Sequence, residues 1–144
     1  MNAEEVKAML CIDHIVWNAL VCLLEKHPRE NLHESGSQPW TSRDVYAHFA
    51  RWLNHSNACI EASCAGKELP IHPFSPEEMN DLWQKEDSVL TLADARTKAM
   101  TALTRRMGII ESIPPGKWDG ELEKLVRYDG ASHYAMHINY IVVT

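Results

Sequence analysis

The sequence predicts an all-α protein, a four-helix bundle in which a long connection between the second and third helices carries a short extra helix. Three observations lead to this fold class. Four long segments place apolar side chains every three to four residues, as a helix does when one face packs on a core. Capping residues, prolines and glycines mark the ends of these segments. No segment of useful length alternates apolar and polar residues as a strand does.

The first helix is expected to begin after Asn2 and to run to about Lys26. Asn2 and Glu5 have the spacing of a capping box, and Pro28 prevents the helix from continuing. The polar residues 28–40 are expected to form a loop. The apolar stripe of this helix consists of Val6, Met9, Leu10, Val16, Ala19, Leu20, Leu23 and Leu24.

The second helix is expected to begin after Thr41, a good N-cap residue, with Asp44 at the position that completes a capping box. It stops before Gly66, a typical glycine at a helix C-terminus. Its apolar face includes Val45, Phe49, Trp52, Leu53, Cys59 and Ile60, and His48 lies on the same face. His48 is therefore expected to point inward.

The long connection spans residues 66–75, and Ser75-Pro76-Glu77-Glu78 then marks the start of a short helix that ends near Glu86. Thr91 and the residues after it begin a third long helix, which runs to about Ile110. Pro114-Pro115-Gly116 breaks the chain again. The last segment extends from Asp119 to about Val142, and Gly130 is a weak point at which it can divide.

Length and composition indicate one soluble domain covering residues 1–144. The sequence is 45% hydrophobic and 24% charged, and its formal net charge is −6. This charge argues against binding to nucleic acid and to anionic membranes. Residues 1–5 lack the basic character of a signal peptide, and the longest apolar run, 15–24, is half of a membrane span. We therefore expect a cytoplasmic protein that does not enter a membrane.

The four cysteines, at positions 11, 22, 59 and 64, show no Cys-x-x-Cys spacing. Free, buried thiols are the expected state in a reducing compartment. The sequence places no histidine where it would obviously activate one of them.

Near the C-terminus, His133 and His137 are four residues apart, so on a helix both imidazoles lie on one face. Such a pair can bind one metal ion if a third ligand is supplied from elsewhere, and His48 is the best candidate. His55 lies two turns beyond His48 and cannot share the ion with it. With eight histidines in 144 residues, chance also produces such pairs, and two half-buried histidines with backbone partners remain the alternative.

Several short motifs, in their order and spacing, resemble the DinB/YfiT-like superfamily over nearly the full chain, with features of the ClbS/DfsB-like branch. The motifs are Trp40 to His48, Asn80-Asp81-Leu82-Trp83, the helix from Leu92, His133-Tyr134 and His133-x-x-x-His137.

The resemblance implies a divalent metal, zinc or nickel, held by His48, His133 and His137. It also implies a homodimer by analogy with the family.

Two functions follow from these features. The first is a divalent-metal-dependent enzyme, a thiol S-transferase or a hydrolase of the detoxification type, with a low-molecular-weight thiol as cosubstrate. The second is a metal-free ClbS/DfsB-like protein that binds a reactive small molecule or confers resistance to it through the same cavity. A purely structural dimer is a weaker third interpretation. The discriminating observation is the metal content.

If the first loop is a simple reversal, Asn18 and His14 lie level with His48 and can line the pocket, although packing elsewhere is the alternative for both. Trp52 and Tyr134 are expected as apolar walls, with plain core packing as their alternative. We assign no residue as general acid or base, since Glu34, Asp44, Glu61 and Asp129 are interpreted as capping or solvated residues. His27, His33 and His72 are interpreted as exposed.

Overall fold

The computed structural model describes residues 1–35 and 38–141, and it describes side chains outside residues 33–38. The side chains of His33 and Glu34 and the predicted helix end at Val142 therefore lie outside the described residues. The elements are α1 (Ala3–Lys26), β1 (His33–Ser35), β2 (Gln38–Trp40), α2 (Ser42–Cys64), α3 (Pro76–Glu86), the 3-10 turn η1 (Asp87–Val89), α4 (Leu92–Glu111), the 3-10 turn η2 (Pro115–Lys117), α5 (Gly120–Tyr128) and α6 (Ala131–Tyr140).

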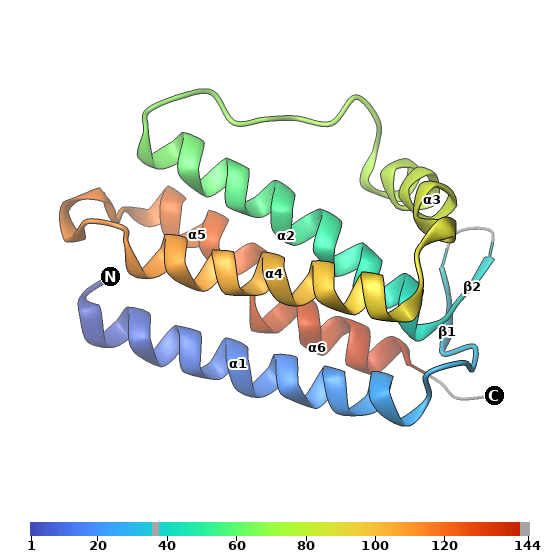
Figure 1. The fold of residues 1–144 in the computed structure, drawn as a ribbon. Helices are drawn as coiled ribbons and strands as arrows, with labels where there is room; N and C mark the ends of the chain where they lie inside the picture. The colour runs from blue at the N-terminus through green and yellow to red at the C-terminus, as the bar shows by residue number, and fades with distance from the viewer. Residues whose placement is uncertain (36–37, 142–144) are drawn as a thin grey trace.

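The protein is all-α apart from one small hairpin, and five helices, α1, α2, α4, α5 and α6, pack as a bundle (Figure 1). Helices α2 and α4 lie side by side and run in the same direction. Residues 65–75 must therefore return along the bundle before α4 can begin, which explains the long connection. The short helix α3 lies at the end of the bundle that also carries the β-hairpin.

The predicted helix starts are confirmed by their capping contacts. The Asn2 side chain accepts a hydrogen bond from the Glu5 backbone at 2.8 Å, and Glu5 accepts one from the Asn2 backbone at 2.8 Å. Ser75 accepts from the backbone nitrogen of Glu78 at 3.2 Å. At the end of α2, Gly66 has a φ of 68°, a left-handed conformation that favours glycine.

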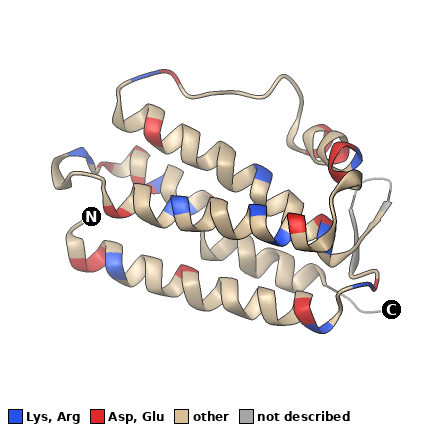
Figure 2. Cartoon of the chain, viewed as in Figure 1, with Lys and Arg blue, Asp and Glu red and all other residues tan. Residues whose placement is uncertain are grey.

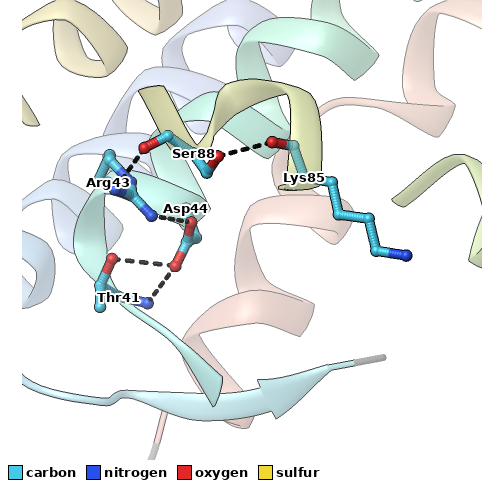
Figure 3. A network of polar contacts seen from close by, with 5 residues as sticks. All are labelled: Thr41, Arg43, Asp44, Lys85 and Ser88. Carbon is cyan, nitrogen blue, oxygen red and sulfur yellow. Dashed lines mark hydrogen bonds and ion pairs between the residues drawn. The ribbon is translucent and has the colours of Figure 1, made fainter. Parts of the chain in front are cut away.

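At the start of α2, the Asp44 carboxylate accepts hydrogen bonds from the backbone nitrogen of Thr41 at 2.9 Å and from its hydroxyl at 3.0 Å (Figure 3). Arg43 donates to Asp44 at 3.0 Å and to the backbone oxygen of Ser88 at 3.2 Å. These contacts join the start of α2 to the turn that follows α3. Asp44 is thus a capping residue, as interpreted from the sequence.

The hairpin was not predicted, because two strands of three residues are too short to show a periodic pattern. Its antiparallel register pairs His33 with Trp40 and Ser35 with Gln38. The backbone nitrogen of Leu32 also donates to the oxygen of Trp40 at 2.8 Å. Leu32 and Trp40 are both buried, so the hairpin fixes an aromatic side chain against the bundle.

The last helical segment divides at Gly130 because a carboxylate from α1 enters there. Asp13 is buried, and its Oδ1 accepts a hydrogen bond from the backbone nitrogen of Ala131 at 2.8 Å. Gly130 offers no side chain to cap α6, so Asp13 supplies the acceptor. Nη2 of Arg106 lies 3.3 Å from Oδ2 of Asp13. The same Nη2 atom donates a hydrogen bond to the backbone oxygen of Val126 at 2.6 Å.

We expect Gly130→Ala to reduce the free energy of unfolding by about 1–3 kcal/mol, because its Cβ would lie 2.8 Å from Asp13 Oδ1. Urea denaturation measures this change. Gly108→Ala is the matched control, since no atom lies within 4 Å of that Cβ and a helical Gly→Ala change stabilises by up to about 1 kcal/mol. Equal stability of the two variants would contradict the tight packing at Gly130.

Candidate metal site

Three imidazoles from two helices meet at one point inside the bundle. One ligand atom from each of His48, His133 and His137 lies within 4.8 Å of the other two. The ring centroids are 4.7 Å apart for His48 and His137, 5.1 Å for His133 and His137, and 5.5 Å for His48 and His133. His48 and His137 are buried, and the side chain of His133 is 12% exposed. The arrangement can hold a metal ion.

The helices place these rings as the sequence predicts. His133 and His137 are one turn apart on α6, and His48 lies in the second turn of α2 on the face of Val45 and Phe49. The Phe49 ring lies 4.7 Å from His133 and 4.8 Å from His137, so it packs against both imidazoles of the α6 pair.

Trp40 from the hairpin also packs against the cluster. Its ring lies 4.8 Å from His48 and is stacked on His137 at 6.1 Å. The aromatic contacts of Trp40 and Phe49 restrict the imidazoles to few rotamers, which favours a preorganised site.

Asp129 is a functional candidate that the sequence interpretation missed. Its Oδ1 lies 3.2 Å from Nδ1 of His133, and the residue is buried, so it is neither solvated nor only a helix cap. A carboxylate on one imidazole nitrogen orients the ring and leaves the other nitrogen for a metal. The separation of four residues between Asp129 and His133 was a signal, but the break at Gly130 hid it.

A cavity of about 600 Å³ opens beside the cluster between α2, α3 and α6. Trp52 lines it, as expected of a wall residue, and donates from Nε1 to Oδ1 of Asn80 on α3 at 2.7 Å. Among the described residues, the lining includes one carboxylate and no lysine or arginine. The lining residues are Trp40, His48, Trp52, Pro76, Asn80, Tyr128, Asp129, Ser132, His133, Met136, His137 and Tyr140.

Tyr134 lies in the core instead of the cavity wall, which corrects one expectation. Its side chain is fully buried against Trp17 at 5.1 Å and Phe49 at 5.5 Å between ring centroids. Burial raises the pKa of its hydroxyl. Tyr134 is thus a core residue, which was the alternative interpretation. It packs against Phe49, which in turn contacts His133 and His137.

The expectation that Asn18 and His14 line the histidine cavity is also wrong. Both are exposed on α1, and His14 borders a different cavity near the start of that helix. Asp13 and Trp17 are the buried residues of this part of α1, and the next residue in a helix points about 100° away. This periodicity was the signal that would have placed Asn18 and His14 correctly.

His72 is half-buried, contrary to its interpretation as an exposed residue. Its ring lies 4.1 Å from His55, 5.5 Å from Trp52 and 5.0 Å from Trp83. The long connection is therefore fixed to α2 and α3 by aromatic packing, close to the cavity wall formed by Trp52.

All four cysteines are free, as predicted, but Cys11 and Cys22 are exposed and not buried. Cys59 lies 3.6 Å from Nε2 of His55, a neighbour that was not expected from the sequence. Burial raises the pKa of the Cys59 thiol and lowers the pKa of His55. Both groups are favoured in their neutral forms, so this pair lacks the character of an activated thiolate.

Fold and site together define an all-α helical protein with a buried three-histidine cluster able to bind a metal. No family model, no curated protein and no solved structure matches this chain. The likeness to the DinB/YfiT-like superfamily thus rests on the motifs alone.

Proposed function

We propose that this protein is a divalent-metal-dependent enzyme of the thiol S-transferase or hydrolase type that acts on small molecules. The observation that supports it is the convergence of His48, His133 and His137 within 4.8 Å beside a cavity of about 600 Å³. Three neutral imidazoles suit zinc or nickel, and three protein ligands are typical of catalytic sites that keep a position open.

A divalent cation in this cluster would lower the pKa of a thiol or a water molecule bound beside it, which produces a nucleophile near neutral pH. The residues of the chain would bind and orient the reactants. Trp40, Trp52 and Met136 offer apolar contact area, and Ser132 offers a hydroxyl. Asp129 would fix the ring of His133.

Membership of the DinB/YfiT-like superfamily and a cytoplasmic location are parts of this proposal. The motif from Trp40 to His48 supports the family relation, since both of its terminal residues lie at the cluster together with the His133/His137 pair. A low-molecular-weight thiol is the proposed cosubstrate in the transferase form of the reaction.

Tag-free protein incubated with zinc or nickel should retain about one equivalent of metal, and His137→Ala should lose it, because two imidazoles alone bind weakly. Mass spectrometric metal analysis after gel filtration measures this. His14→Ala is the matched control, since His14 is exposed and lies outside the histidine cavity. Native protein without metal after this treatment would contradict the metalloenzyme and favour the metal-free ClbS/DfsB-like binding or resistance protein.

We expect Asp129→Asn to weaken metal binding by about 10–100-fold, because the amide lacks the negative charge that the carboxylate places 3.2 Å from Nδ1 of His133. Competition with a chromophoric chelator measures the affinity. Glu121→Gln, which removes a carboxylate whose side chain is 91% exposed, should leave it unchanged. Equal affinities of Asp129→Asn and native protein would refute the orienting role.

We expect the metal-loaded protein to accelerate the reaction of two thiols with monochlorobimane to different extents. The acceleration over the uncatalysed rate should be at least about tenfold larger for benzyl mercaptan than for mercaptosuccinate. The thiol sulfur bonds to the bimane carbon, chloride leaves and the thiol proton passes to solvent. The reason is charge: among the described residues, the cavity offers no cation for a dicarboxylate and contains Asp129. His137→Ala is the control. If the metal-loaded protein accelerates the reaction of neither thiol, S-transfer is contradicted and the hydrolase is the form of the proposal that stands.

A further inference from the structure

Helix α1 presents an apolar stripe to solvent on the side away from the core. The outer stripe consists of Ala8, Ile12, Ile15, Ala19 and Cys22, and all five residues are exposed. Their separations alternate between four and three residues, which is the spacing of a helix–helix seam. The two isoleucines at its centre are 57% and 62% exposed. Small residues on both sides of them allow another backbone to approach closely.

The fold of a single chain does not account for this stripe. By length and composition α1 is apolar enough to cross a membrane, yet only 28% of its most apolar stretch is buried. From Ala8 to Leu24 the one charged residue is Asp13, which is buried. Figure 2 shows the other charges of α1 gathered at its two ends. A long uncharged face of this kind marks an interaction surface.

We propose that the outer stripe binds the outer stripe of a second copy of this chain, with the two α1 helices antiparallel. A two-fold axis near Ile15 would place each stripe on its equivalent, as an isologous contact requires. The ends of the stripe are complementary in charge: Glu4 is exposed at the start of α1, and Lys26 is exposed at its end. An antiparallel pair brings each Glu4 toward the Lys26 of the other copy.

The helix dipoles favour the same orientation, because the positive N-terminus of one helix then lies beside the negative C-terminus of the other. A parallel pair would instead place Glu4 and Glu5 next to their own copies. The net charge of −6 disfavours an anionic membrane as the occupant.

None of the residues that line the histidine cavity belongs to α1. The proposed dimer would therefore leave both cavities accessible, and it is independent of the metal site. The inference goes beyond the proposed function for this reason.

The test is the mass of the tag-free protein in solution, measured by light scattering over a wide concentration range. Native protein should have twice the 16.4 kDa mass of the chain. Ile15→Lys should weaken association by at least about 100-fold, because two ammonium groups would meet in an apolar contact. Val89→Lys is the matched control: Val89 is 85% exposed on η1, away from the stripe, and its replacement should change nothing. Circular dichroism establishes that each variant is folded.

The orientation is tested by charge reversal. Glu4→Lys should weaken the dimer, and the additional change Lys26→Glu should restore it, which only an antiparallel pair explains. A native protein that is monomeric at every concentration, or a dimer unaffected by Ile15→Lys, would overturn the proposal. So would a monomer that co-sediments with phosphatidylcholine vesicles and loses this binding in Ile15→Lys, since the stripe would then be a membrane surface.

Discussion

The buried carboxylate of Asp13 is the contact on which the arrangement of the site depends. It binds the first backbone nitrogen of α6 and lies beside the guanidinium of Arg106, so three helices and the end of α5 meet at one group. A buried charge pair is costly to desolvate, and removing one partner leaves the other uncompensated. The same contact sets where α6 begins, and therefore where His133 and His137 lie relative to α2.

Around this point the protein separates two kinds of environment. On the core side of the histidines, Trp17, Phe49 and Tyr134 form an apolar cluster with edge-to-face ring contacts. On the cavity side of the histidines, the lining consists of aromatic side chains and a few polar groups. An imidazole cluster at such a boundary is shielded from bulk water yet reachable by a small molecule, which is the arrangement that ligand-binding cavities share.

The sequence predicted what local rules determine: helix starts at Asn2, Thr41 and Ser75, the break at Gly130, and the inward face of His48. Their signals lie within a few residues of each other. Apart from the meeting of His48 with His133 and His137, contacts between distant segments were not predicted from the sequence. The hairpin that positions Trp40 is too short to show a periodic pattern, and a helix break separates Asp129 from His133. Asn18 follows the buried Trp17 and therefore lies on an exposed side of α1.

The contact between Asp13 and Ala131 joins residues that are 118 positions apart. This contact cannot stabilise the fold until both of its residues have been synthesised. Because the ribosome synthesises a chain from its N-terminus, Ala131 becomes available long after Asp13. Two of the three histidines lie on α6, which follows every other described helix. The cluster can therefore form only after α6 has been synthesised, so any metal that it holds must be acquired after that point and not by a folding intermediate that lacks α6.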